Sequence, residues 1–258
     1  MQKGIWLKKN KIKNIYPYLS DNMECDVVIV GGGISGAITA YFLAKDGFKI
    51  AVIEKNLIGY QTTGVSSACV TDFIDELYIK SAANKEKNME RKLLDLKRKA
   101  NSLLDEIAVD IQKNEYLKKT DYTILNTRMF QRSMLKNEIN IRNDIGEKVD
   151  INENNTGINI KQGARMLDSY DFASRVFEYI SRFPNVHIFE NTELKESVFK
   201  PNLIFSCSII SAWTQYAPKL NFDIFWIIVF IFSFSNVRYL NAVNTAMDSK
   251  RILTLKLP

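Results

Sequence analysis

Residues Asp26–Glu54 read DVVIVGGGISGAITAYFLAKDGFKIAVIE, an order of residue types that predicts a strand, a glycine turn, a helix and a second strand. The β-branched run Asp26–Val30 is typical of a buried parallel strand. Small apolar residues give the helix one face that can pack closely, and Gly47 is predicted to end it. Lys49–Ile53 then predicts the second strand. This segment therefore indicates an α/β fold with a parallel sheet.

Three glycines at the turn match the spacing G-x-G-x-x-G. Gly31 permits the tight turn, Gly33 lets a pyrophosphate approach the backbone, and Gly36 lets the helix pack against the strand. Glu54 follows at close to the spacing of about 20 residues expected for an acid that binds ribose hydroxyls. The alternative is a glycine-rich turn with no ligand. The surrounding strands, helix and acid favour a dinucleotide site, whose pyrophosphate would meet amides at the start of the helix.

The charge of the chain gives no sign of a nucleic-acid partner. The 258 residues carry a net charge of +6 and suffice for one large domain or two small ones. The basic excess in Lys85–Lys99 alternates with acids at helical spacing, which predicts a solvated helix face with i,i+4 pairs. No aromatic residues accompany it in the manner of a nucleic-acid-binding module, so no nucleic-acid partner is predicted.

The cysteines and the single histidine argue against a metal site. Cys25, Cys69 and Cys207 lack metal-ligand spacing, and their number is odd. His187, the only histidine, is predicted to be structural or exposed. No metal is therefore expected. The absence of a secretory segment at the start of the sequence predicts a reducing, cytoplasmic location.

The order of predicted elements divides the chain into three parts. Residues 1–25 form an N-terminal arm, residues 26–195 a dinucleotide-binding domain with a helical insertion at about 73–145, and residues 196–258 a hydrophobic tail. Predicted helices are Phe73–Lys113 in two pieces, Arg128–Asn143 and Tyr170–Ser181; predicted strands are Tyr122–Leu125 and Asn185–Phe189, and Asp150–Gly163 is predicted to be loop plus a short strand.

The tail differs in composition from the rest of the chain. All 11 glycines lie at or before Gly163, and Phe222–Phe234 reads FDIFWIIVFIFSF. This run is shorter than the roughly 20 apolar residues of a membrane-spanning helix, so no span is predicted. A buried strand pair or core helix is the simplest interpretation. An interfacial or partner-binding segment, through which the chain forms an oligomer, and a tail that folds differently from its relatives are the alternatives.

Three segments of the chain resemble the FAD-dependent oxidoreductases of the D-amino acid oxidase and glycine oxidase group. The strongest is Asp26–Lys55, and the second is Leu57–Asp75, LIGYQTTGVSSACVTDFID, similar to the family's second flavin-contacting loop. The third and weakest is Leu167–Leu194. The resemblance implies FAD as cofactor and these binding residues: Gly31, Gly33, Ile34, Ser35, Gly36, Glu54, Lys55, Thr62, Thr63, Ser66 and, by a backbone contact near the adenine, Leu194. An ordinary turn-and-cap cluster is the alternative for the hydroxyl residues.

The resemblance covers roughly residues 5–195 and implies a Rossmann-like FAD-binding domain with an incomplete substrate domain. Leu203–Trp213 is only faintly similar to a strand that ends in a glycine turn in relatives, because its glycine is absent. The glycine-free tail also offers no second flavin segment. Beyond residue 195 the sequence therefore looks truncated, shifted in frame or strongly diverged.

The activity implied by the resemblance is hydride transfer from a C–N bond of an amine or amino acid to the flavin. No catalytic residue is identified in the sequence. One alternative is a catalytically incomplete dinucleotide-binding fragment, or half of a split flavoenzyme that uses Phe222–Phe234 as an interface. Another is an NAD-dependent dehydrogenase, since Glu54 suits either ribose. The Thr62–Ser67 loop and the helical insertion favour FAD.

Overall fold

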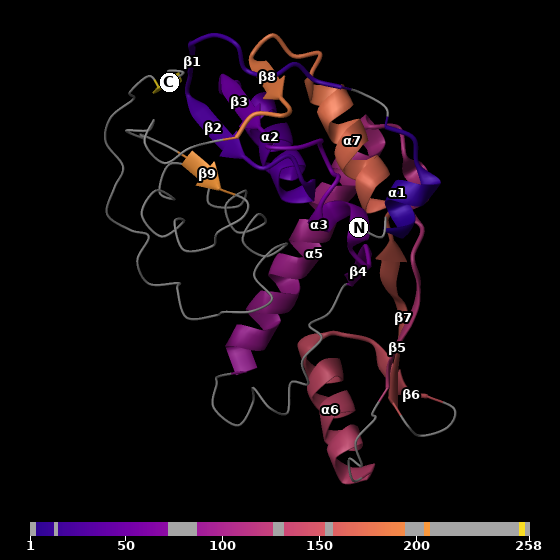
Figure 1. Cartoon of the computed structure of the whole chain (residues 1–258). Coiled ribbons are helices and arrows are strands. Elements are labelled where there is room, and N and C mark those ends of the chain that lie inside the picture. The colour runs from indigo at the N-terminus through magenta and orange to yellow at the C-terminus, as the bar shows by residue number, and fades with distance from the viewer. Residues whose placement is uncertain are drawn as a thin grey trace. The chain divides into compact units, whose positions relative to one another are not determined.

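The computed structural model describes residues 4–12, 15–71, 87–125, 132–152, 157–193, 204–206 and 253–255. The chain forms two compact units (Figure 1). The first combines Met1–Ser67 with Asp168–Pro258, and the second is Ala68–Leu167. The predicted Leu194 and Phe222–Phe234 lie outside the described residues.

The first unit is built on a parallel sheet with the strand order β8-β3-β2-β9. These strands are β2 (Val27–Val30), β3 (Ile50–Ile53), β8 (Val186–Phe189) and β9 (Ile204–Ser206). The register pairs Val30 with Ile53 and Ile53 with Phe189, so the carboxyl ends of three strands are level. The prediction of an α/β fold with a parallel sheet is therefore confirmed.

Helix α2 (Ile34–Lys45) is almost entirely buried and packs against β2, β3 and α7 (Ser169–Ile180). Alanines at 37, 40 and 44 are among its buried residues, which allows this close packing. Asp168 begins α7, because its side chain accepts the amide hydrogen of Asp171 at 3.0 Å. Gly47 follows the end of α2 with a φ of 84°, a left-handed conformation that confirms the predicted helix end.

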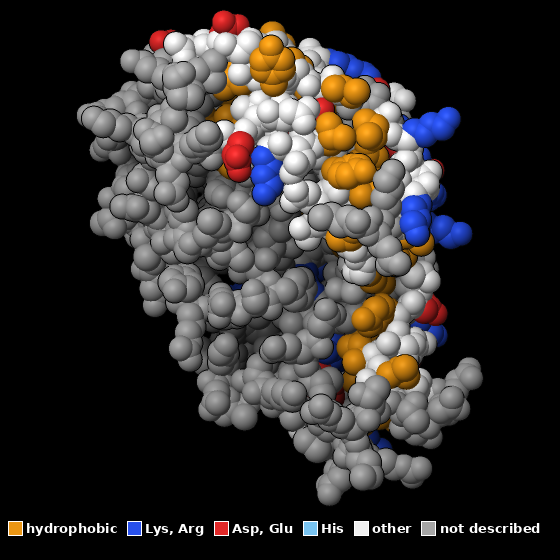
Figure 2. Space-filling model, viewed as in Figure 1, with side chains coloured by type: hydrophobic (Ala, Val, Ile, Leu, Met, Phe, Trp, Pro, Cys, Tyr) orange, Lys and Arg blue, Asp and Glu red, His pale blue; other side chains and the backbone are white. Residues whose placement is uncertain are grey.

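The N-terminal arm has structure that the sequence did not predict. It contains a short helix, α1 (Ile5–Lys9), and a strand, β1 (Met23–Cys25), which pairs antiparallel with β10 (Leu253–Leu255). Helix α1 contacts α7 and the single-turn helix α3 (Thr62–Val65). Large exposed hydrophobic residues of the arm are Ile5, Ile12, Ile15 and Tyr18. Figure 2 shows one face of the molecule, on which hydrophobic side chains lie beside lysines and arginines.

The second unit is an antiparallel sheet with two long helices. Its sheet is β4 (Cys69–Thr71), β7 (Gly157–Met166) and β5 (Thr120–Leu125), with β6 (Val149–Ile151) also paired to β7. Its helices are α5 (Lys87–Asp110), the 3₁₀ turn η1 (Asn114–Leu117) and α6 (Arg132–Ile145). The predicted helices and the strand at Tyr122–Leu125 are present over the described residues, with shifted ends.

Asp150–Gly163 was predicted to be loop plus a short strand, and the strand that begins in this range is longer than predicted. Strand β7 has 10 residues and pairs with three other strands. Its sequence, GINIKQGARM, contains glycines and a lysine and does not alternate regularly between apolar and polar residues, so the usual strand signal is weak. Its pairing with β4, β5 and β6 supplies the stabilisation that local propensity lacks.

Buried charged groups connect helix and turn in this second unit. Arg142 on α6 is fully buried and contacts Glu138 at 2.7 Å and Glu147 at 2.6 Å. Arg165 on β7 forms an ion pair with Asp105 of α5. Since buried charges need partners, the Arg165 pair holds β7 to α5, whereas Arg142 holds the turn at Glu147 against the end of α6. Within the described part of the chain, no helix is both long and apolar enough to cross a membrane.

Candidate functional site

The glycine turn between β2 and α2 has the geometry that its sequence predicts. Gly31 has a φ of 109°, a conformation that favours glycine. A Cβ atom on Gly36 would overlap the carbonyl oxygen of Gly31, so the helix can approach the turn only without a side chain there. Gly33 is the N-cap of α2 and provides no side-chain cap. The N-terminus of α2 therefore presents backbone amides at the carboxyl edge of the sheet.

Glu54 lies beside this turn because β3 is the parallel neighbour of β2. Its Oε2 accepts the amide hydrogen of Gly32 at 2.7 Å, and its Oε1 accepts that of Asn56 at 2.8 Å. The residue is 9% exposed. A carboxylate has about four lone-pair sites, so two remain for donors from a ligand such as ribose hydroxyls.

The predicted hydroxyl loop also reaches the turn, through Thr63. Its Oγ1 accepts the amide hydrogen of Ile34 at 3.0 Å and would lie 2.8 Å from a Cβ on Gly33. Ser66 donates its hydroxyl to the Thr63 carbonyl at 3.1 Å, and Ser169 of α7 donates to the same oxygen at 2.6 Å. The Thr63 hydroxyl therefore lies at the start of α2, beside the backbone amides that an anion bound there would contact.

The other predicted residues differ in their closeness to this turn. Ser35 is the second residue of α2 and is half-buried, whereas Thr62 and Lys55 are exposed. The structure thus brings together Gly31, Gly33, Gly36, Ile34, Glu54 and Thr63, with Ser66 held behind Thr63. Leu194 lies outside the described residues, so its predicted role stays a prediction.

Sequence reasoning missed Glu190, a second carboxylate at the same edge. It follows β8 as Glu54 follows β3, and it is 1% exposed. Its oxygens accept the amide hydrogens of Ile58 at 2.7 Å and Tyr16 at 2.9 Å. The repeated order of strand then glutamate was the available signal.

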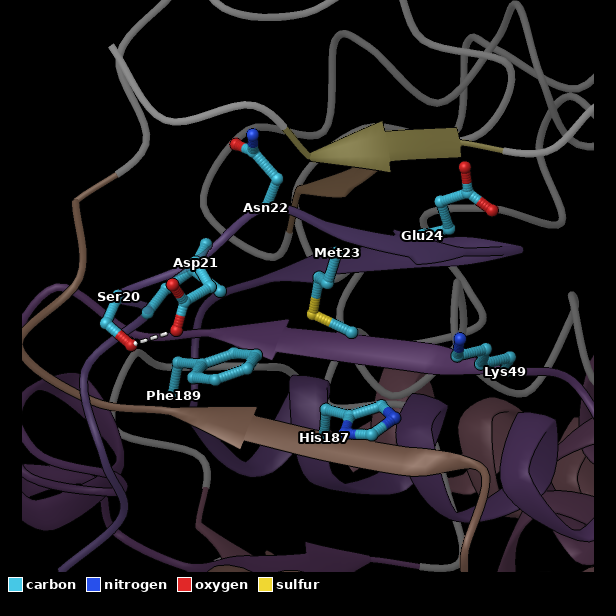
Figure 3. A pocket seen from close by; sticks show the side chains of 9 residues that line it. Ser20, Asp21, Asn22, Met23, Glu24, Lys49, His187 and Phe189 are labelled. Atoms are coloured by element: carbon cyan, nitrogen blue, oxygen red, sulfur yellow. Dashed lines mark hydrogen bonds between the residues drawn. The ribbon is translucent and has the colours of Figure 1, made fainter.

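A pocket of about 310 Å³ lies away from these residues. Its lining comes from the segment Leu19–Glu24 together with Lys49, His187 and Phe189 (Figure 3). None of the predicted cofactor residues is among them. His187 is thus a pocket residue on β8, consistent with the prediction of a structural or exposed histidine. No group of three or more His, Cys, Asp or Glu within the described ranges is arranged to hold a metal ion.

Burial shifts three ionisable groups of this unit. It raises the pKa of the Cys25 thiol to about 11, and the charge of Asp26 adds to the rise. It also raises the pKa of Tyr170, with Glu190 as one contributing charge. Burial and the positive charge of Lys49 lower the pKa of His187. None of these groups belongs to the glycine turn.

Solved structures share the fold of the chain at low sequence identity. Glycine oxidase from Geobacillus kaustophilus matches with a TM-score of 0.51 and 20% identity, over 66% of this chain and 47% of that one. L-amino acid deaminase from Proteus vulgaris matches with a TM-score of 0.51 and 13% identity, over 73% of this chain and 45% of that one. The chain therefore spans about half the length of these structures, whose likeness supports the Rossmann-like fold.

Curated relatives match over shorter segments. "Putative Rieske 2Fe-2S iron-sulfur protein YhfW" of Bacillus subtilis (strain 168) is 46% identical over 63 residues, 24% of this chain and 12% of that protein. Thiamine thiazole synthase of Pyrococcus abyssi is 44% identical over 57 residues, 22% of this chain and 23% of that enzyme. These matches cover too little of either relative to transfer an activity.

The family described as "FAD dependent oxidoreductase", DAO, matches residues 26–170, which is more than half of the chain. That range contains the glycine turn, Glu54 and the Thr62–Ser66 loop. The chain therefore belongs to the FAD dependent oxidoreductase family, which confirms the predicted family and its cofactor, FAD.

Proposed function

We propose that the chain binds FAD at the glycine turn and uses it to oxidise a C–N bond of a small amine or amino acid. The observation that carries this proposal is the convergence of Glu54 and Thr63 on residues 31–34, through the bonds to Gly32 and Ile34. Glu54 directly follows β3, the strand next to the turn, whereas Thr63 lies in a separate loop. A glycine turn with only a structural role requires neither.

The residues present fit each part of the cofactor. Glu54 keeps free acceptor sites for the two ribose hydroxyls of adenosine. The amide of Ser35 at the start of α2 suits the pyrophosphate, and Gly33 leaves room for its approach. The Ile34 amide beside it is bonded to Thr63 Oγ1. Thr63 and Ser66 can add hydroxyl contacts, and Leu194 a backbone contact near the adenine. Family membership favours FAD over the NAD alternative.

The chemistry of the reaction belongs to the cofactor. Bound FAD would supply the hydride acceptor for oxidation of the substrate C–N bond, and the residues of the glycine turn and of the Thr62–Ser66 loop would bind and orient it. Glycine oxidase and L-amino acid deaminase among the solved structures support an amino-acid substrate class. We assign no catalytic residue, and the alternative of an incomplete fragment or half of a split flavoenzyme stays open as a prediction.

Location and assembly also stay predictions. The cytoplasmic location is a proposal from the sequence, in which the three cysteines are odd in number and show no pairing pattern. Oligomer or partner contacts were predicted for Phe222–Phe234, which lies outside the described residues.

Binding measurements with Glu54→Gln test the proposed cofactor site. Gln accepts through one oxygen only, so we expect FAD affinity to fall by about 1–3 kcal/mol, the range for a lost hydrogen bond to a charged group. ADP affinity should fall equally, whereas FMN, which lacks adenosine, should bind as before. Glu178→Gln, at a half-buried position on α7 away from the glycine turn, is the matched control. Equal FAD affinity in the Glu54 variant and the wild type would show that the ribose assignment is wrong.

A further inference from the structure

We propose that Glu190 is a positioning residue of the FAD site, which connects the N-terminal arm to the loop that follows β3. This inference rests on the proposed function, because the loop contains Thr63 and Ser66. It concerns a residue that does not itself contact the glycine turn. Glu190 would act by fixing the place of residues that do.

The carboxylate of Glu190 is shared between two segments far apart in the sequence. Oε1 accepts the amide hydrogen of Ile58 in the loop at 2.7 Å, and Oε2 accepts that of Tyr16 in the arm at 2.9 Å. With 1% of the residue exposed, water does not compete effectively for these bonds. A buried carboxylate is costly unless it is hydrogen-bonded, so both amides are needed to keep it in place.

Backbone hydrogen bonds continue the connection toward the glycine turn. Asn191 donates its amide to the Asn56 carbonyl at 3.0 Å, which aligns the chain after β8 with the loop after β3. One residue past Ile58, Gly59 donates to the Gly32 carbonyl at 2.9 Å. The side chain of Ile58 also packs over Gly32, since a Cβ there would lie 2.8 Å from its Cγ1. Moving Ile58 would therefore move the contact between loop and turn.

The arm contacts the other end of the same loop. Trp6 donates its indole N–H to the Ser66 carbonyl at 2.9 Å, and Leu7 packs against Gly64, where a Cβ would lie 2.6 Å from Leu7 Cγ. Near Glu190, the Pro17 carbonyl accepts the Glu190 amide at 3.0 Å. The arm is thus bonded to the loop directly at Ser66 and through Glu190 at Ile58. Both ends of the segment that places Thr63 depend on these bonds.

Replacement by glutamine separates this role from simple burial. Gln has nearly the same size, but it has one acceptor oxygen, and its NH₂ group would face the second amide donor. Glu190→Gln therefore breaks one of the two connections while it keeps the packing. Glu138→Gln is a matched control, because Glu138 is also 1% exposed but lies on α6 in the second unit, bonded to Arg142.

The test compares ligand affinities and amide exchange in the full-length wild type, Glu190→Gln and Glu138→Gln. We expect Glu190→Gln to bind FAD at least about tenfold more weakly, as for a lost hydrogen bond to a charged group. AMP, which would use Glu54 and the glycine turn but not Thr63 or Ser66, should lose less affinity than FAD does. Hydrogen exchange should become faster at the Ile58 or Tyr16 amide. A merely structural role would weaken both ligands alike.

Trp6→Phe gives a second, milder test at the other end of the arm. It removes the indole N–H that is bonded to Ser66, keeps an aromatic ring and changes no charge, so FAD affinity should fall more than AMP affinity. If the wild type binds FAD and both variants bind it equally well, Glu190 and the arm have no positioning role, although the proposed function stands. If the wild type itself does not bind FAD, the proposed function fails and this inference fails with it. The wild type and the variants therefore separate the two outcomes.

Discussion

Alanine at Gly36 should mainly lower stability, whereas alanine at Gly33 should mainly weaken FAD binding, because the two glycines face different atoms. At Gly36 a new Cβ meets the backbone carbonyl of Gly31 far inside the 3.0 Å limit of real Cβ contacts. That carbonyl cannot rotate away, since its peptide group also contains the Gly32 amide, which donates to Glu54 Oε2 at 2.7 Å. At Gly33 the nearest atom is Oγ1 of the Thr63 side chain, at 2.8 Å, which can rotate.

The magnitudes follow from these contacts. Overpacking costs about 1–3 kcal/mol. Because the Gly31 carbonyl that a new Cβ would meet is held in place, we expect a cost of about 3 kcal/mol for this contact in Gly36→Ala. Alanine in a helix returns about 1 kcal/mol of helix propensity, so the net loss in the free energy of unfolding is about 2 kcal/mol, or roughly 30-fold in the folding equilibrium. Gly33→Ala, at an N-cap, should cost under about 1 kcal/mol. It should nevertheless weaken FAD binding, because Cβ fills the path of the pyrophosphate.

Urea unfolding and FAD titration of the two variants measure both quantities. We expect Gly36→Ala to lose more stability than Gly33→Ala, and Gly33→Ala to bind FAD more weakly than the wild type at temperatures where it is fully folded. Two variants of equal stability would refute the argument from the Gly31 carbonyl. Unchanged FAD affinity in Gly33→Ala would refute the placement of the pyrophosphate.

Three further outcomes follow from buried groups. The Cys25 pKa of about 11 keeps this thiol protonated at neutral pH, so iodoacetamide should label exposed Cys69 much faster than buried Cys25. Peptide mass mapping measures the two labelling rates, and equal rates would contradict the burial of Cys25. Arg142→Met leaves two buried carboxylates without their partner and should cost about 3–5 kcal/mol in urea unfolding. Arg182→Met should cost under about 1 kcal/mol, because the Arg182 side chain is 70% exposed in its pair with Glu178. Similar losses in the two variants would refute the contrast. Because the pKa of His187 is lowered in the folded state, the unfolded chain binds a proton more readily at this residue. The contribution of neutral His187 to stability is therefore fully present above its ordinary pKa of 6.5 and is lost as the pH falls through its folded-state pKa. His187→Gln should therefore show a weaker decrease of stability in acid, and an identical pH dependence would count against it.

Much of the first unit could be predicted because its signals are local. The run Val27–Val30, the glycine turn and the strand Ile50–Ile53 lie within one short segment, and each residue type agrees with its place. Glu54 was predicted from spacing alone, and the parallel register then explains its contact with Gly32. Thr63 was predicted by resemblance, and its bond to the Ile34 amide provides a structural reason.

The features that sequence reasoning missed depend on long-range contacts. Strand β7 forms with little local propensity, because three partner strands pair with it. Glu190 is recognisable as part of the site only when Ile58 and Tyr16 are close to it, and Tyr16 lies more than 170 positions earlier. The arm likewise has few local signals, and its contacts with Ser66 and Gly64 come from folding.

The visible spectrum of the purified, desalted chain tests the central claim most directly. We expect the absorption bands of oxidised flavin after desalting, or their appearance in the protein fraction once FAD is added and excess FAD is removed. A folded chain that stays colourless after incubation with FAD would contradict the proposal that Glu54, Thr63 and the start of α2 form an FAD site.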